Sequence, residues 1–199
     1  MIVDFAKSRK GSQSFKEWSL RKFAFLCVTL RNNSLEKRPK IKIESTPADR
    51  VLEVAGWLAL AFLWIITLYN FKNLPAEIPT HFNGMGEVDA YGSRSTLLGL
   101  PIVGTVLFIG LTILNRFPHI FNYPVQITAE NAARQYTLAT RLIRLMKLSL
   151  VIIFILIVWS TTAVALEKAG KMSAWFLPVM LGIIFIPLGV YLYRSFRVR

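Results

Sequence analysis

Three side chains able to bind a metal or move protons stand close together in one polar stretch of the sequence. His81, Glu87 and Asp89 lie within residues 71–95, FKNLPAEIPTHFNGMGEVDAYGSRS. Imidazole and carboxylate groups at this spacing can coordinate a metal or act as general acid and base. The alternative is structural, because the same groups can cap turns and pair with Arg94. A lone histidine with two carboxylates favours the structural interpretation, so we predict no metal site.

The backbone around these residues is rich in turn formers. Pro75 and Pro79 stiffen the entry, residues 83–86 (Asn-Gly-Met-Gly) can reverse the chain, and residues 78–82 and 87–91 partly alternate in polarity. This pattern predicts a short β-hairpin. We expect Gly84, Gly86 and Gly92 to adopt backbone angles that a side chain would strain. As the most distinctive surface of the chain, the hairpin supplies the candidate ligand-binding residues His81, Asn83, Glu87, Asp89 and Arg94.

Motifs of the common enzyme classes are missing from the sequence. It has no H-E-x-x-H, no phosphate-binding glycine loop and no Ser/His/Asp set on one side. Cys27 is the only cysteine, which excludes an intrachain disulfide and a cysteine metal cluster. We therefore predict no catalytic residue and no cofactor, and we expect His119 to lie on the opposite side of the membrane from His81.

A second group of chemically active residues is basic. Residues 129–147 contain no Gly or Pro, and Thr128 is the predicted N-cap of a helix that continues into an apolar stretch. Guanidinium and ammonium groups bind phosphate well. We therefore predict contacts with lipid phosphates by Arg134, Arg141, Arg144 and Lys147.

The polar hairpin and the basic segment are both attached to long apolar blocks, which determine where they lie. Of the 199 residues 54% are hydrophobic and only 18% are charged, whereas soluble domains are roughly a quarter charged. The apolar residues gather at about 51–70, 97–115, 148–166 and 175–193, and each block can cross a bilayer. These blocks predict an all-α membrane protein with four transmembrane helices and the hairpin between the first two. The short connection after the third predicts that the last two helices are antiparallel neighbours.

The basic residues predict the orientation of these helices. Twenty of the 24 Lys and Arg residues fall on the side of the two termini and four on the other side. Because basic residues near spans stay in the cytoplasm, this asymmetry predicts both termini inside and the hairpin outside. The net charge of +13 is thus explained by topology. Its predicted partner is an anionic cytoplasmic lipid surface rather than nucleic acid.

Residues 1–36 form a separate basic arm on the cytoplasmic side. Its apolar run, Phe23–Leu30, is too short to span, and no signal-peptide cleavage site follows. The arm is either an interfacial anchor, a tail without fixed structure or a start-site artefact. We expect the membrane domain to comprise residues 37–199.

Two segments resemble an uncharacterised bacterial membrane family. They are LPAEIPTHFNGMGEVDAYGSRSTLLGLPIVG and FNYPVQITAENAARQYTLATRLIRLMK, and the hairpin motif within them comprises Ile78-Pro79-x-His81-Phe82-Asn83, Gly86, Asp89 and Gly92-Ser93. They look like the domain of unknown function numbered 1648, which also forms the N-terminal part of SdpI-like immunity proteins. The resemblance implies a multi-span inner-membrane protein. For SdpI-like members it implies protection against a secreted toxin and capture of a soluble repressor.

These observations together favour a non-enzymatic inner-membrane protein. It would bind or sense an envelope component, a peptide or a protein partner through the outer loop. The alternatives are a small transporter and a membrane enzyme using His81 and Asp89. Transport is disfavoured because ion carriers usually hold ionisable groups within their spans, and here only Glu53 lies at the edge of one.

Overall fold

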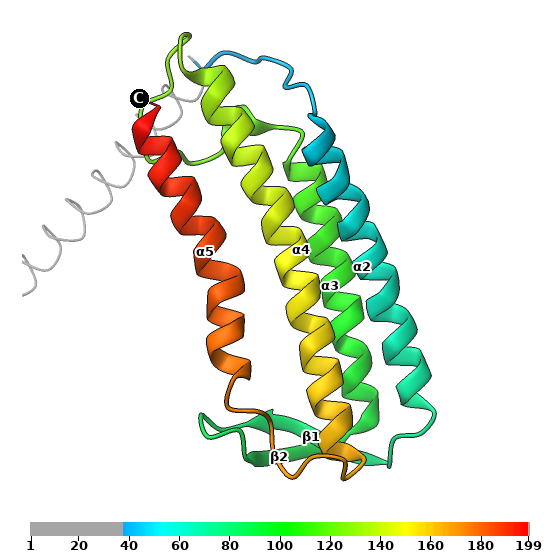
Figure 1. Ribbon diagram of the computed structural model, residues 1–199. Helices are drawn as coiled ribbons and strands as arrows, with labels where there is room; N and C mark the ends of the chain where they lie inside the picture. Colours follow the sequence, from blue (N-terminus) through cyan, green and yellow to red (C-terminus); the bar gives the residue numbers. More distant parts are fainter. Residues whose placement is uncertain (1–37, 199) are drawn as a thin grey trace, which may run out of the picture. The chain divides into compact units, whose positions relative to one another are not determined.

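Four long helices make up most of the structure, a computed structural model that describes residues 38–198 (Figure 1). They are α2 (Pro47–Phe71), α3 (Gly99–Leu114), α4 (Ala132–Ala165) and α5 (Phe176–Arg197). All four are long and apolar enough to cross a membrane, α3 together with the 3₁₀ turn that precedes it. The predicted four spans are confirmed. The predicted N-terminal arm, residues 1–36, lies outside the described residues.

The first helix begins one turn before the apolar block does. Thr46 is its N-cap: the Thr46 hydroxyl accepts from the Asp49 amide at 3.3 Å, and the Asp49 carboxylate accepts from the Thr46 amide at 3.0 Å. This reciprocal pair satisfies two amides that the first turn would leave without a partner. Pro47 follows the cap, where its missing N–H costs nothing. Charged Asp49 is thereby fixed inside the helix rather than before it.

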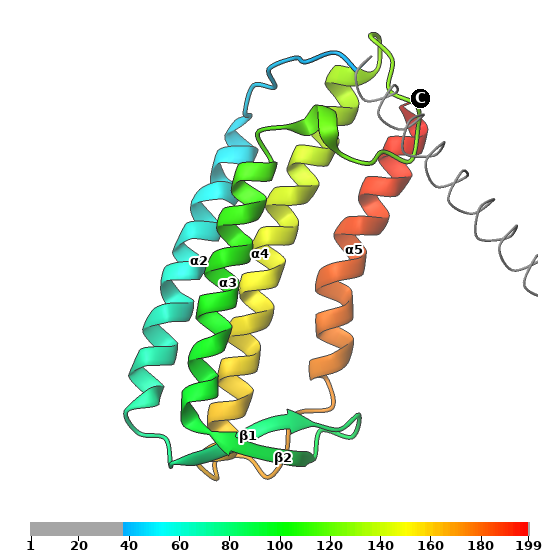
Figure 2. The ribbon, with the colours of Figure 1, turned by 180° about the vertical axis from the view of Figure 1, so that it is seen from behind.

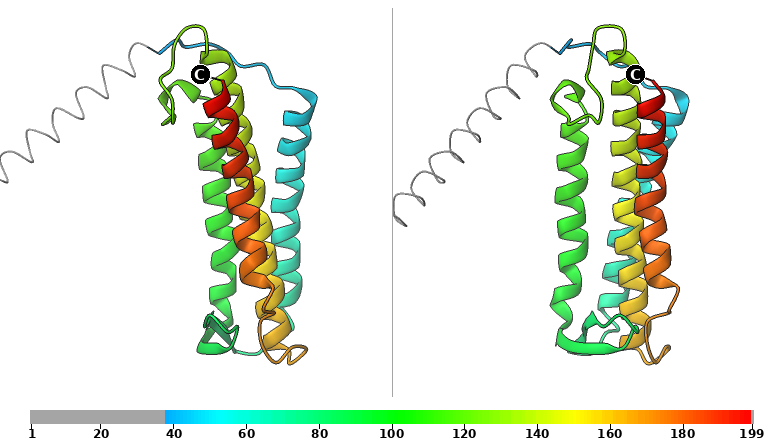
Figure 3. Two further views of the ribbon diagram at one scale, coloured as in Figure 1. Left: turned by 60° about the vertical axis from the view of Figure 1, so that its left-hand side comes forward. Right: turned by 90° about the vertical axis from the view of Figure 1, so that its left-hand side faces the viewer.

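Helix α4 is the centre of the bundle. Helices α2, α3 and α5 each pack against it, and Figure 2 shows that the axes of the four helices are roughly aligned. Helices α4 and α5 are antiparallel neighbours, as predicted, whereas α2 and α4 run parallel (Figure 3). The buried hydrophobic core joins α2, α3 and α4 through residues such as Leu63, Phe108, Val151 and Val158. Helix α5 buries least, and its contacts are mainly with α4.

A two-stranded antiparallel sheet lies across one end of the helices. Strand β1 (Glu77–Phe82) pairs with β2 (Val88–Ser93), so the predicted hairpin is confirmed. Ile78 is 1% exposed and belongs to the same core cluster as the helices. The register shifts on both sides of His81. Such a bulge re-aims a side chain, here one of the candidate site residues.

The start of α4 differs from the prediction. The helix begins at Ala132 rather than Ala129, and its N-cap is Asn131 rather than Thr128. The Thr128 amide donates to Asn131 Oδ1 at 2.9 Å, which closes a turn before the helix. Within that turn, a hydrogen bond with the Thr128 side chain lowers the pKa of Glu130, so a negative charge stays beside the helix N-terminus. As predicted, α4 then continues unbroken, for 34 residues.

The hairpin defines one end of the bundle, which we call the hairpin end. The beginnings of α2 and α4 and the end of α5 lie at the other end, the opposite end (Figure 1). The 3₁₀ turn Pro118–Ile120, which contains His119, also lies there, so the two histidines are far apart as expected. Which end faces the cytoplasm stays a prediction from the charge asymmetry.

Candidate functional site

Asn83 holds the turn of the hairpin together. Its Nδ2 donates to Glu87 Oε2 at 3.0 Å, while its Oδ1 accepts from the amides of Met85 at 2.8 Å and Glu87 at 3.0 Å. The side-chain oxygen thus accepts from the turn amides as a backbone carbonyl would, a common role of asparagine in turns. The structure places Asn83 and Glu87 as turn residues. A ligand-binding role for either stays a prediction.

Arg94 closes the entry of the hairpin. Its Nη1 donates to the Leu74 carbonyl at 3.2 Å, and the guanidinium stands 5.1 Å from the ring centroid of Phe71. The structural interpretation of the loop expected Arg94 to pair with the loop's carboxylates. Among the described residues the carboxylate ion pairs of the hairpin do not include Arg94. Arg94 instead joins the end of α2 to the start of the helical turn that leads into α3.

His81 and Asp89 face one another across the two strands. His81 Nδ1 lies 2.5 Å from Asp89 Oδ1, and the two side chains are 69% and 42% exposed. A pair this exposed contributes little to stability. Contact through Nδ1 leaves the second ring nitrogen, Nε2, to meet a ligand. No group of three His, Cys, Asp or Glu residues within 38–198 is arranged to hold a metal ion.

A cavity of about 330 Å³ lies beside this pair, between the hairpin and the α4–α5 connection. Helices α4 and α5 contribute Ile157, Phe176 and Leu177, so the walls are largely apolar. The hairpin contributes residues of its turn and of strand β1, among them His81. Cavities of this size with apolar walls and a few polar groups are typical of ligand sites. The predicted site residue His81 therefore borders a real concavity.

Gly86 fixes how the hairpin meets the helices. The Met172 amide donates to the Gly86 carbonyl at 2.8 Å, which ties the turn to the α4–α5 connection. Gly86 has φ +79°, and a Cβ there would lie 2.4 Å from the Met172 carbonyl oxygen. The expected strain is therefore confirmed for Gly86. It is wrong for Gly84, which has an ordinary φ and open space around it.

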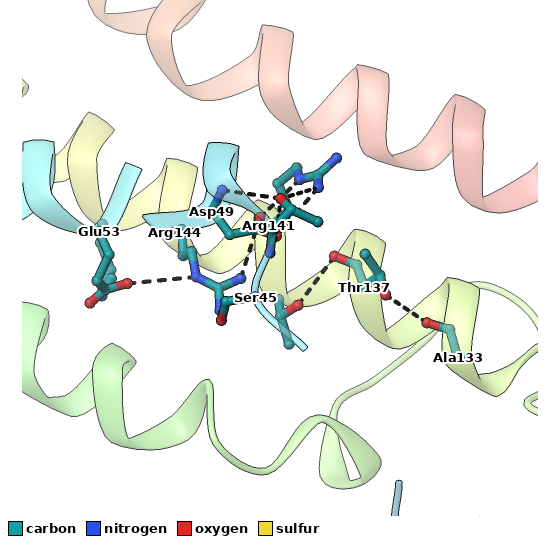
Figure 4. A network of polar contacts seen from close by, with 10 residues as sticks. Ser45, Asp49, Glu53, Ala133, Thr137, Arg141 and Arg144 are labelled. Atoms are coloured by element: carbon teal, nitrogen blue, oxygen red, sulfur yellow. Dashed lines mark hydrogen bonds and ion pairs between the residues drawn. The ribbon is translucent and has the colours of Figure 1, made fainter. Parts of the chain in front are cut away.

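A buried ionic cluster joins α2 and α4 at the opposite end. Arg141 Nε donates to Asp49 Oδ1 at 3.0 Å, and the Asp49 side chain is only 2% exposed (Figure 4). Arg144 follows one turn later and lies between Asp49 and Glu53, 3.6 Å from each. Because α2 and α4 run parallel, residues of increasing number meet in order along both helices. We call Asp49, Glu53, Arg141, Arg144 and Lys147 the ionic ladder.

Lys147 is the innermost member of the ladder. Its Nζ donates to Glu53 Oε1 at 2.6 Å and to the Thr112 hydroxyl at 2.8 Å, and its side chain is 1% exposed. The ammonium also stands 4.5 Å from the ring centroid of Phe108 on α3. Three helices thus converge on one charge. A buried ammonium needs such partners, because an unpaired one would be strongly destabilising.

The predicted lipid-contacting residues have different surroundings. Arg134 is exposed, whereas Arg141, Arg144 and Lys147 are directed at carboxylates of α2. Phosphate contact by the four stays a prediction, with Arg134 the most accessible. Sequence reasoning missed Asp49 and Thr112 and gave Glu53 no partner. The sequence did hold one signal, the spacing of the charges. Asp49 and Glu53 are four residues apart and Arg141, Arg144 and Lys147 three apart, so each set lies on one face of its helix.

Comparison with known proteins identifies one part of the chain. Residues 58–105 match the family described as a domain of unknown function, DUF1648, so the predicted resemblance is confirmed. This range covers most of α2, the whole hairpin and the start of α3, but none of the ionic ladder. The relation to SdpI-like immunity proteins stays a prediction.

One curated relative is an uncharacterised protein of Archaeoglobus fulgidus. It is 34% identical over 87 residues, which cover 40% of this chain and 48% of the relative. The chain therefore spans about half the length of that relative. This relative is archaeal, whereas the resemblance implied a bacterial family. No solved structure matches the chain.

Proposed function

We propose that this multi-pass membrane protein is a non-enzymatic binding or sensing protein of the cell inner membrane. Its hairpin end takes up an apolar group of an envelope component or peptide. The observation that supports this proposal is the cavity of about 330 Å³ between the hairpin and the α4–α5 connection. The resemblance to SdpI-like immunity proteins suggests a secreted toxic peptide as one such ligand.

The walls and the rim of this cavity suit different parts of an amphipathic peptide. Ile157, Phe176 and Leu177 offer apolar surface, and burying one aliphatic side chain there would contribute roughly 1.5–3 kcal/mol. At the rim, the exposed His81–Asp89 pair offers a carboxylate to a cationic neighbour on the ligand. The proposed binding depends on the shape and polarity of the cavity and needs no catalytic group.

Photocrosslinking tests this proposal directly. In a Cys27→Ser background, benzophenone is attached at Gly84→Cys, a position with open space on the cavity lining. The full chain in nanodiscs is irradiated with a biotinylated amphipathic Leu/Lys peptide. We expect saturable crosslinking at position 84 and only background from a label at Lys42→Cys, an exposed position before α2. Equal crosslinking at both positions would mean that the peptide binds the lipid and would refute the proposal.

Two variants locate binding in the cavity itself. Ala174→Phe places a ring on the cavity lining, whereas Gly170→Phe adds the same ring in the same connection but outside this cavity. We expect the first to weaken crosslinking about tenfold, which corresponds to the loss of one buried apolar group. The second should leave crosslinking unchanged. The reverse order would place the binding surface elsewhere.

A small transporter is the second candidate function. The observation that favours it is the burial of the Lys147 side chain. Its ammonium is buried among three helices beside Glu53, and ionisable groups inside membrane helices commonly lie on ion pathways. Proton uptake into proteoliposomes, followed with an entrapped pH dye, tests this alternative. Flux above that of empty liposomes, lost in Lys147→Met/Glu53→Gln, would support it. Absence of such flux would eliminate it.

A further inference from the structure

A second cavity lies beside the ionic ladder at the opposite end of the bundle. It has a volume of about 290 Å³ and is formed by the first turns of α2, the end of α3 and Arg144 of α4. Unlike the cavity at the hairpin end, it is lined by residues that are all polar or charged: Ser45, Asp49, Arg50, Glu53, Thr112, Asn115, Arg116 and Arg144.

Three arginines on this lining have hydrogen-bonding capacity to spare. Within residues 38–198, the carboxylate ion pairs involve neither Arg50 nor Arg116. Arg144 is only 14% exposed, yet its contacts with Ser45, Asp49 and Glu53 are 3.5–3.6 Å long. Contacts of that length are not good hydrogen bonds. Arg141 differs, since its Nε donates to Asp49 at 3.0 Å.

The same cavity also offers hydrogen-bond acceptors. Asn115 Oδ1 is buried and lacks a donor among the described residues. Glu53 gives one oxygen to Lys147 at 2.6 Å, while its other oxygen has only the 3.6 Å contact with Arg144. A buried acceptor without a donor costs free energy, so a donor on a bound ligand would be favourable here. The fitting ligand therefore carries both anionic oxygens and N–H or O–H donors.

Exposed apolar side chains stand next in sequence to the residues of the cavity lining. Val51, Val54 and Ile113 belong to the same helix ends and are 66%, 58% and 54% exposed. Within a membrane these side chains face acyl chains. A molecule that places its polar group among the arginines can thus lay its chains along α2 and α3. A phospholipid has this shape, and inorganic phosphate does not.

We propose that this cavity binds the phosphodiester headgroup of a membrane phospholipid whose headgroup also carries a hydroxyl or an amine. Arg50, Arg116 and Arg144 bind the phosphate oxygens. Asn115 and Glu53 accept from the headgroup hydroxyl or amine. Guanidinium groups suit this role because they bind phosphate oxygens with paired, charge-assisted hydrogen bonds.

Lipid-induced thermal stabilisation of the purified full chain in detergent tests this proposal. We expect phosphatidylglycerol or phosphatidylethanolamine to raise the melting temperature at low molar excess. Phosphatidylcholine, which has the phosphate but no donor, should act only at about tenfold higher concentration. Inorganic phosphate should have no effect at millimolar concentration. Stabilisation by inorganic phosphate alone would assign the site to a soluble anion and overturn the lipid assignment.

A matched pair of double variants separates this site from general charge attraction. Arg50→Gln/Arg116→Gln removes two cavity arginines, and Arg194→Gln/Arg197→Gln removes two exposed arginines at the same end but off the lining. All four side chains are exposed, so both proteins should fold and melt alike without lipid. The first should require about tenfold more phosphatidylglycerol and the second nearly the same amount as the wild type. Equal loss in both would reduce the effect to surface charge and refute the site.

Asn115→Asp provides an independent check on the acceptor side. It keeps the size of the side chain but places a carboxylate beside the bound phosphate, so it should weaken phosphatidylglycerol binding about as much as the cavity double variant. Unchanged phosphatidylglycerol binding by Asn115→Asp would show that Asn115 lies away from the headgroup. That result would contradict the proposed geometry.

Discussion

The two ends of the bundle use the same kinds of charged residue in opposite ways. At the hairpin end His81 and Asp89 pair across two strands with side chains 69% and 42% exposed. At the opposite end Asp49 is 2% and Lys147 1% exposed, and their partners come from other helices. The exposed pair is open to a ligand, whereas the charges of Asp49 and Lys147 are paired within the protein.

This difference teaches that burial, more than residue type, decides what an ion pair does. Water screens the exposed pair, so it contributes little to stability and can exchange partners. Asp49 and Lys147 lie where solvent cannot replace a lost partner, so removing a partner of either is costly. Removing a buried ladder charge should therefore change stability, whereas removing the exposed His81–Asp89 pair should change binding.

The largest effect is expected from Lys147→Met. This change leaves Glu53 without its 2.6 Å partner and Thr112 without a donor, and should cost about 3 kcal/mol of unfolding free energy. Reversible unfolding in mixed micelles measures it. The control is Lys147→Met/Glu53→Gln, which should recover a large part of the loss because neither member of this pair is left charged without the other. A single variant as stable as the wild type would break the contrast between the two ends.

This prediction depends on residues whose roles the sequence did not reveal. Hydrophobic blocks predicted the four spans and turn-forming residues predicted the hairpin, because span length and turn chemistry are local properties. That Lys147 meets Glu53, 94 residues away, depends on α2 packing parallel to α4. Nothing local encodes that pairing. The cavity beside His81 was unpredictable for the same reason, since Phe176 and Leu177 reach it from the last helix.

The second largest effect is expected from Gly86→Ala. The added Cβ would meet the Met172 carbonyl oxygen at 2.4 Å in a backbone conformation with φ +79°, so we expect a loss of roughly 2 kcal/mol. Gly84→Ala, two residues away in open space, should change stability by less than about 0.5 kcal/mol. Thermal melts of both variants measure the difference. Similar melts would mean that the hairpin is not held against the α4–α5 connection.

A smaller effect is expected at the cap of α2. Thr46→Ala removes the hydroxyl that accepts from the Asp49 amide and donates to the Asp49 carboxylate at 2.7 Å, and should cost about 1 kcal/mol. Ser45→Ala, one residue earlier, loses only a 3.5 Å contact with Arg144 and should be nearly neutral. Melting temperatures of the two proteins test this order. A larger loss from Ser45→Ala would show that Arg144 depends on that contact more than its length indicates.

The smallest effect on stability, with the largest on binding, is expected from His81→Asn/Asp89→Asn. Both side chains are exposed and their bond crosses the strands, so the hairpin backbone does not depend on them. The unfolding free energy, followed through the melting temperature, should change by less than about 0.5 kcal/mol.

Peptide crosslinking at position 84 should nevertheless fall in this double variant, because the cavity lining loses the His81 imidazole and the neighbouring carboxylate of Asp89 is lost as well. Glu77→Gln is the control: it removes one exposed negative charge from the same strand, away from the cavity lining. It should leave both stability and crosslinking unchanged. If the double variant instead crosslinks normally, the apolar walls alone account for binding. If it melts much earlier than wild type, the exposed pair is structural after all, and the two ends of the molecule do not differ as burial predicts.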